Sequence, residues 1–329
     1  MSQGADSLRY YIYGIVHDDA SLPEGLLGYA DEPLELITSR GLSAVVSTLT
    51  NEPERDASSL LLFYQAQQRV LMGLRTRAVL PAQVGSSLSS REAVAFMLHV
   101  HAEDLGEQLD GLVGVAQFNL SVSWQLSQEI QLAALTSDVQ TLRAALQMQS
   151  EITLGDQARV GELIARQLEY ERHRLMDRVL HAIEADLTEY GVVARDGETT
   201  AFNLVLLACR NGRDALLARL GAIEGISGRL EWQLSAALPA SAFRSLEVIE
   251  PSPADLERAR STLRLPVSAP LVPPQVQRAY KQLALEKHPD RRQNNENAAE
   301  EMRELGWARD LLEVAYSGVG VRVQKVVSR

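Results

Sequence analysis

The chain has 329 residues, of which 46% are hydrophobic and 23% are charged, a composition that suits two or three packed domains and excludes wholesale disorder. Its net charge of -11 argues against non-specific nucleic-acid binding. The start of the chain lacks a basic segment followed by a long apolar one, and no run approaches the ~20 apolar residues needed to span a bilayer. With a single cysteine and hence no internal disulfide, the chain is expected to be a soluble cytoplasmic protein that does not bind a membrane.

The first part of the chain mixes short strands with helices, as judged from runs of β-branched and aromatic residues and from helical spacing of apolar residues. The predicted elements are strands over 8–16, 42–49 and 78–85, a helix over 56–75, and a helix that Ser89 or Ser90 caps and that runs to about 110. The first helix is predicted from the helix-compatible spacing of Leu60, Tyr64, Leu71 and Leu74. Pro81 lacks a backbone donor, so its strand belongs at a sheet edge or a bulge.

The second part begins with the clearest strand of the chain. Over 115–124, apolar residues alternate with polar ones, which is typical of an antiparallel strand with one solvent-exposed face. A similar alternation over 226–234 includes an inward Trp232, which corresponds to the inward Trp124 of strand 115–124. The other predicted elements are helices over 128–148, 156–190 and 212–223 and a strand over 199–209.

These elements predict an α+β fold with two lobes, each a small antiparallel sheet with packed helices, followed by an all-α helical hairpin. We place the first lobe at 1–125, a helical segment and a second, ferredoxin-like lobe at 126–250, and a tail at 251–329. The tail differs chemically from the body, since residues 271–329 hold 10 lysines and arginines against 8 acidic residues.

The sequence contains no recognisable catalytic or metal-binding constellation. His99 and His101 are two residues apart and point in different directions on a helix, and His173 and His181 are expected on a solvated helix face. Cys209 ends the apolar run TAFNLVLLAC and is expected to pack in a core. The chain is therefore not expected to be an enzyme or to bind a metal or a cofactor.

The tail begins where prolines crowd the chain after residue 250. Three helices are predicted there, one from Ser252-Pro253 to Pro266, one from Pro273 or Pro274 to near Lys287, and one over about 297–316. Their inward stripes are predicted to include Ala259 and Leu263, Val276 and Leu283, and Leu305 and Leu312, in that order. The second helix is followed by His288-Pro289-Asp290 and the polar loop RRQNNEN.

The tail resembles a J-domain of the DnaJ type, on the run YKQLALEKHPDRR with a helix on either side. This resemblance implies a cochaperone that docks on a DnaK-type chaperone and stimulates its ATP hydrolysis. It assigns the signature to His288, Pro289 and Asp290 and the basic docking face to Arg278 and Lys281. A basic helix face of this kind steers toward an acidic partner surface.

The body resembles the gas vesicle protein F/L family (GvpF/GvpL). The segments that carry this resemblance are, in order, RYYIYGIV, GLSAVVSTL, AVLPAQVGSSLSSREAVAFML, FNLSVSW and GRLEWQLSAALPASAFRSLEV. They cover about residues 8–250. The resemblance implies a two-lobed cytoplasmic accessory protein of gas vesicle formation, which binds the small hydrophobic shell protein or other gas vesicle accessory proteins.

Three hypotheses for function follow. The first is a gas vesicle assembly factor that also recruits a DnaK-type chaperone through its tail. The second is a general DnaJ-type cochaperone whose body binds other clients. The third, an enzyme, is the weakest, because no nucleophile, base and stabilising group belong together in the sequence. In the first two cases an exposed sheet edge offers one binding route, by accepting an added strand.

Overall fold

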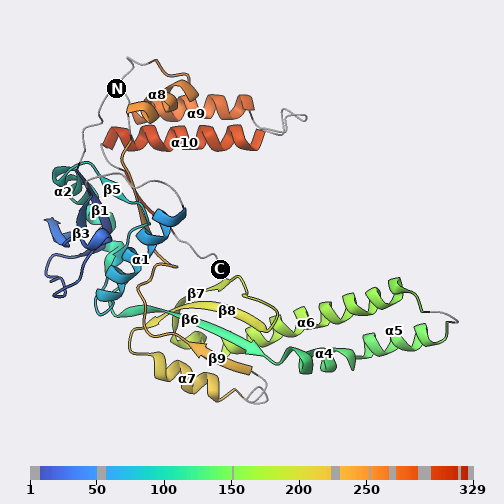
Figure 1. The fold of residues 1–329 in the computed structure, drawn as a ribbon. Helices are drawn as coiled ribbons and strands as arrows, with labels where there is room; N and C mark the ends of the chain where they lie inside the picture. Colours follow the sequence, from blue (N-terminus) through green and yellow to red (C-terminus); the bar gives the residue numbers. More distant parts are fainter. Residues whose placement is uncertain are drawn as a thin grey trace. The chain divides into compact units, whose positions relative to one another are not determined.

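The computed structural model describes residues 8–49, 57–149, 152–223, 230–251, 253–266, 272–287, 298–317 and 320–324. The chain forms two compact units, drawn in Figure 1. The first contains the residues up to Val113 and Pro239–Lys325, and the second contains Gly114–Leu238. Strand 115–124, which we placed in a lobe of residues 1–125, lies in the second unit, because its sheet partners come from later in the chain.

The first unit contains an antiparallel sheet in the order β2-β3-β1-β4, with β5 also paired to β1. Its strands are β1 (Arg9–His17), β2 (Glu35–Ser39), β3 (Leu42–Leu49), β4 (Leu80–Pro81) and β5 (Ser87–Leu88). The register of β1 against β3 shifts between Ile12 and Gly14. A Cβ atom at Gly14 would lie 2.8 Å from the carbonyl oxygen of Leu80, so only glycine lets β4 approach this closely.

The helices of the first unit are α1 (Ala57–Gly73), α2 (Arg91–Val100) and α3 (Ala102–Asp110), with a short 3-10 turn η1 (Tyr29–Asp31) between β1 and β2. The Ser90 hydroxyl accepts a hydrogen bond of 3.0 Å from the backbone N–H of Ala93, which confirms the predicted cap of α2. The predicted helix to residue 110 is instead two helices, because His101, with φ -103° and ψ 18°, breaks the helical backbone between them.

The second unit has the βαββαβ element order and the sheet order β7-β8-β6-β9 of a ferredoxin-like fold, with all pairs antiparallel. Its strands are β6 (Val115–Trp124), β7 (Leu187–Val193), β8 (Thr200–Cys209) and β9 (Leu230–Leu234). Its helices are α4 (Leu126–Ala134), α5 (Ser137–Gln147), α6 (Leu154–Ile183) and α7 (Arg213–Gly221). The prediction of antiparallel sheets is therefore confirmed in both units.

Two predicted helices of this unit differ in extent from those in the structure. The predicted helix over 128–148 is α4 and α5, separated by Leu135 and Thr136. The predicted helix over 156–190 ends as α6 at Ile183, and the 3-10 turn η2 (Glu184–Asp186) leads into β7. Leu187 continues the apolar spacing of α6, which made a longer helix plausible, but the residues after it pair with β8.

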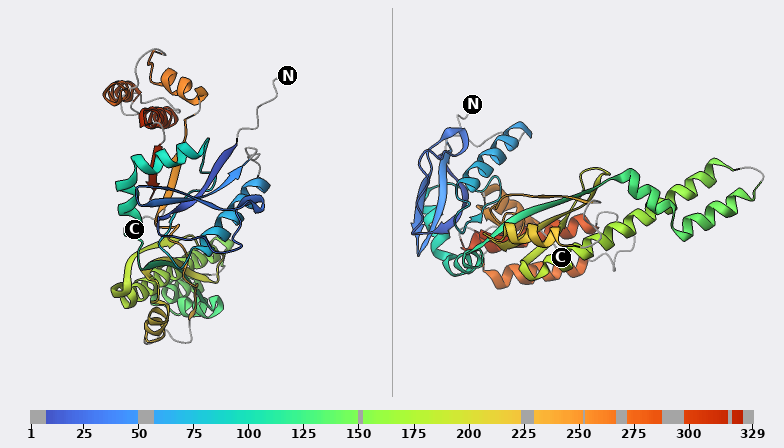
Figure 2. Two further views of the ribbon diagram at one scale, coloured as in Figure 1. Left: turned by 90° about the vertical axis from the view of Figure 1, so that its left-hand side faces the viewer. Right: turned by 90° about the horizontal axis from the view of Figure 1, so that it is seen from below.

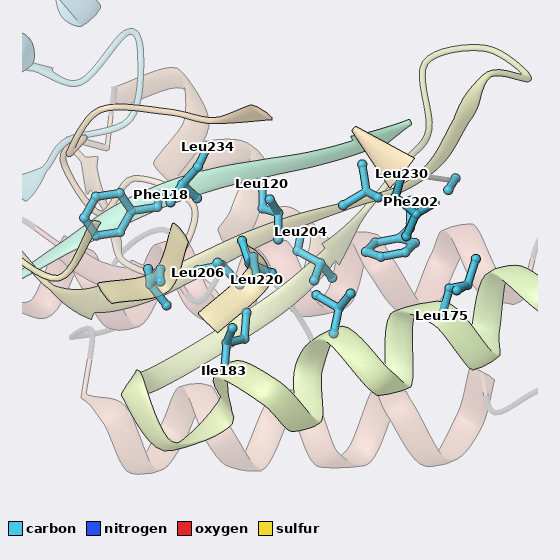
Figure 3. Close-up of a cluster of buried hydrophobic side chains, with 14 of the residues drawn as sticks. Phe118, Leu120, Leu175, Ile183, Phe202, Leu204, Leu206, Leu220, Leu230 and Leu234 are labelled. Carbon is cyan, nitrogen blue, oxygen red and sulfur yellow. The ribbon is translucent and has the colours of Figure 1, made fainter. Parts of the chain in front are cut away.

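The core of the second unit lies between one face of the sheet and the helices α6 and α7. Figure 3 shows side chains from β6, β8 and β9 meeting those of α6 and α7, among them Phe118, Leu206, Ile183 and Leu220, all at most 1% exposed. The helices α4, α5 and the first half of α6 form an arm that extends beyond the sheet (Figure 2, right). The opposite face of the sheet carries the polar residues of the alternation, such as Asn119 and Ser121.

The C-terminal part of the first unit is a helical module closed at its base by two paired strands. The module consists of α8 (Pro253–Thr262), α9 (Pro273–Lys287) and α10 (Ala298–Ser317). It is inserted between β10 (Ser245–Ile249) and β11 (Gly320–Gln324), which pair antiparallel. The backbone N–H of Gln83 donates to the carbonyl of Leu246 at 2.7 Å, which joins β10 to the residues that follow β4.

The pairing of β11 with β10 should stabilise this base. A chain that ends at Ser317 loses a ladder of five residue pairs, and we expect a loss of about 2 kcal/mol, or ~4–8 °C in the melting temperature. Proteases should also cleave the module faster. A chain that ends at Gln324 keeps the ladder and is the control. Equal melting temperatures for the two truncated chains would contradict a stabilising role for β11.

Candidate interaction surfaces

The described residues contain no group of three or more histidine, cysteine, aspartate or glutamate side chains placed to hold a metal ion. Among them, no helix has the length and apolar character required to cross a membrane. His181 is 87% exposed, as predicted for a solvated helix face. Cys209 is exposed, so the prediction of a core cysteine was wrong, because the residue ends β8 where the strand leaves the core.

Only part of the predicted chaperone-docking site lies among the described residues. His288, Pro289 and Asp290 lie outside them. Arg278 and Lys281 are exposed on α9, whose last residue, Lys287, directly precedes this signature. Arg278 also borders a cavity of about 470 Å³ between the end of α8 and α9. The assignment of these five residues to chaperone docking stays a prediction.

The helical module has its own core, built largely from the predicted inward stripes. The buried residues are Ala259, Leu263, Val276, Leu283, Leu305, Ala308, Leu311 and Leu312. Figure 1 shows α9 and α10 side by side, and the guanidinium of Arg309 lies 4.5 Å from the ring centroid of Tyr280 across this contact. Arg258 of α8 pairs with Glu304 of α10 at 3.0 Å.

The first turns of α1 carry an exposed apolar surface, which we call the α1 patch. It consists of Leu60, Leu61, Leu62 and Tyr64, each between 50% and 56% exposed. Leu60 and Tyr64, whose spacing predicted this helix, are exposed, because the run LLLFY is apolar on every side of the helix and periodicity does not select the inward face. Phe63 and Val70, both at most 2% exposed, are the inward residues. An exposed apolar patch of this kind is a candidate protein interaction site.

The helical arm of the second unit also exposes apolar side chains. Leu135, Met148 and Leu154 are 70%, 91% and 84% exposed, and they lie at or beyond the ends of α4, α5 and α6. Thr153 and Asp156 form a capping box at the start of α6, so backbone N–H groups at this helix end have hydrogen-bond partners without a ligand. These three side chains are scattered, whereas the α1 patch is contiguous in sequence.

Comparisons with known proteins give one consistent result. The family model described as gas vesicle synthesis protein GvpL/GvpF matches residues 9–244. The gas vesicle protein GvpF from Anabaena sp. PCC7120 has a similar structure, with a TM-score of 0.56 and 17% identity over 71% of this chain and 94% of that chain. GvpF from Microcystis aeruginosa is similar at a TM-score of 0.53 and 18% identity, over 70% of this chain and 97% of that one.

At these identities the two solved structures show a shared fold. Comparison with curated proteins gives no match. The family match ends at residue 244, and β10 begins at Ser245, so the whole helical module with its paired strands lies beyond the matched segment.

Proposed function

This chain belongs to the GvpL/GvpF family of gas vesicle synthesis proteins, and on that premise we propose that it is an assembly factor that binds shell or other accessory proteins and recruits a DnaK-type chaperone through its helical module. Membership of the family supports the role in gas vesicle assembly. The choice of partners and the recruitment of a chaperone are the parts that we propose.

The α1 patch is the observation that favours binding of an apolar partner. A small hydrophobic shell subunit is prone to aggregate before it is assembled, and an exposed apolar helix face can cover part of its surface. Four half-exposed apolar side chains lie within five residues on α1, and Phe63 between them anchors the helix in the core. A partner could therefore dock on the patch while the fold of the first unit is unchanged.

Recruitment of a chaperone would use the exposed face of α9. Arg278 and Lys281 make no ion pair with any other described residue, so their charges face solvent. They lie on the helix that leads into His288-Pro289-Asp290, and a basic face beside that signature favours an acidic partner surface. Neither residue contributes to the core of the module, which leaves both available for docking.

A pull-down from vesicle-forming cells separates these roles. The baits are the wild-type chain, His288→Gln, the double variant Leu61→Ser with Tyr64→Ser, and Gln65→Ser, an exposed control on the same helix. We expect the double variant to capture shell protein about tenfold less, because two apolar contacts are lost, and to keep the chaperone. His288→Gln should keep shell protein and lose the chaperone. The Gln65→Ser chain should behave as wild type.

Other outcomes would change the proposal. Equal capture of shell protein by the double variant would exclude the α1 patch as its binding surface. Absence of a chaperone from every bait would show that the module has a structural role only. Capture of a chaperone without any gas vesicle protein would favour a general DnaJ-type cochaperone whose body binds other clients.

A further inference from the structure

The end of β7 and the loop after it border three cavities of the second unit. One, of about 660 Å³, lies on the open face of the sheet, lined by Val193 and polar residues that include Asn203 and Gln233. A second, of about 180 Å³, lies between β7 and α6 and includes Val192, Met176 and Phe202. A third, of about 550 Å³, lies beside α4 and α6 and reaches the loop at 195–198.

β7 presents an open sheet edge between these cavities. It is the outermost strand in the order β7-β8-β6-β9, and no other strand of the described residues pairs with its outer side. Val192 and Val193 are 52% and 41% exposed. In an antiparallel pair, alternate residues of the outer strand direct their N–H and C=O groups away from the sheet, where an added strand can pair with them.

The two valines lie on opposite faces of the sheet. Val192 pairs in register with Leu204 on the core side, beside α6, and Val193 pairs with Asn203 on the open side. A strand added to this edge would place alternate side chains in the helix-side cavity and in the open-face cavity.

The helix-side cavity is lined by two arginines that share one carboxylate. Arg172 and Arg195 contact the same oxygen, Oε1 of Glu169, at 2.5 and 3.0 Å. Burial alone raises the pKa of Glu169, but the hydrogen bond from Arg195 and the two positive charges hold this pKa below its ordinary value. Glu169 is thus ionised and balances only one of the two arginine charges. His173, which also lines the cavity, donates from Nδ1 to the carbonyl of Glu169 at 2.7 Å.

Arg172 is held rigidly but its hydrogen bonding is incomplete. Its guanidinium lies 4.6 Å from the ring centroid of Trp124 and donates at 3.2 Å to the carbonyl of Glu198, whereas Nε is buried without a partner. Arg166 and Glu198 both line the third cavity, together with Arg172 and Arg195. The open-face cavity instead has the acidic residue Asp196 in its lining. An acidic side chain is therefore favoured on the helix side and disfavoured on the open side.

We propose that the β7 edge binds an extended acidic segment of a partner protein as an added strand, with one glutamate or aspartate side chain between Arg172 and Arg195. Backbone pairing with β7 supplies the affinity, and the arginines select the acidic residue. Glu169 acts as an internal counter-ion that competes with the incoming carboxylate. This site lies in the second unit, away from the α1 patch and the helical module in sequence, and it is independent of the function proposed above.

The test uses the full chain and two fluorescein-labelled hexapeptides, Thr-Val-Thr-Glu-Thr-Val and the same peptide with glutamine in place of glutamate. Binding is measured by fluorescence anisotropy. We expect the glutamate peptide to bind about tenfold more tightly than the glutamine peptide. Arg195→Gln should abolish this preference. Glu169→Gln should strengthen binding of the glutamate peptide several-fold, because the competing carboxylate is removed.

The matched control is Arg159→Gln, which removes the same charge from an exposed position on α6 outside all three cavities. Opposite effects of Arg195→Gln and Glu169→Gln cannot arise from a general loss of structure. The proposal fails if neither peptide binds below millimolar concentration, if the two peptides bind equally, or if Arg159→Gln weakens binding as much as Arg195→Gln. Variants of the α1 patch should bind the glutamate peptide as the wild type does, whatever their effect on shell protein.

Discussion

Replacing Gly28 by alanine is expected to destabilise the first unit by about 3 kcal/mol. Gly28 has φ -81° and ψ -153°, a backbone that any residue adopts, so the cost comes from lack of space. An added Cβ would contact the hydroxyl of Tyr13 and lie 2.9 Å from Oγ of Ser47. Both atoms are held by the buried core and have little room to move away.

The clash at Gly28 would also break a hydrogen-bonded chain. The hydroxyl of Tyr13 lies 2.9 Å from Oγ of Ser47 and accepts a hydrogen bond of 2.6 Å from the backbone N–H of Tyr29. Burial raises the pKa of Tyr13, so the phenol stays protonated and keeps its donor. Displacing the ring would leave buried polar groups without partners, which adds to the cost of the overlap.

Urea unfolding followed by circular dichroism would measure this loss, and hydrogen exchange of β1 would place it in the first unit. Gly106→Ala is the matched control. Gly106 lies within α3 with no atom within 4 Å of an added Cβ, so alanine should stabilise the chain by roughly 0.5–1 kcal/mol. A Gly28→Ala chain as stable as the wild type would show that the core around Tyr13 can relax.

Replacing Phe118 by alanine is expected to cost the second unit about 3–5 kcal/mol. Phe118 is fully buried on β6, a central strand of the sheet, and stands opposite Leu206 of β8 in register. Its ring belongs to the core that also holds Leu220 of α7 and Ile183 of α6 (Figure 3). Removing the ring leaves a cavity between the sheet and the helices. Because these elements are packed against one another, they cannot move in to fill it.

The neighbouring residue provides the control. Asn119 is exposed on the opposite face of β6, and its side chain accepts a hydrogen bond from Gln117, so Asn119→Ala should cost less than about 1 kcal/mol. Trp124 and Trp232 lie in the second unit and Trp307 in the helical module, so fluorescence during urea unfolding in a Trp307→Phe background reports on the second unit. Similar losses for the two variants would contradict the alternation of faces along β6.

Two consequences follow from the inserted helical module. The module is attached to the rest of the first unit at more than one point. β10 and β11 pair at its base, and Glu250 forms an ion pair with Arg9 of β1 at 3.0 Å. Removal of all residues after 250 would therefore also remove the partner of β10, and its effect on vesicle formation would combine two causes. The substitution His288→Gln avoids this problem, since it changes one side chain of the predicted J-domain signature.

The sequence by itself determined those elements whose pattern is strong and local. The alternation over 115–124 predicted β6 and its buried face, and the spacing of Ala259, Val276 and Leu305 predicted the core of the helical module. Ser90 was one of two predicted caps and is the residue that caps α2. In each case the side-chain period and the preference of the residue type point to the same structure, so no distant partner is needed to decide it.

The tertiary structure alone decided the elements that depend on a partner far along the chain. β2, β7 and β11 are short, and each exists because a strand beside it accepts its backbone hydrogen bonds. The same reason determines which surfaces are open. Leu60 and Phe63 are equally apolar, but only Phe63 faces the sheet, and β7 has a free edge because it is the last strand of its sheet. Pairing and packing are relations between segments, and no local pattern encodes them.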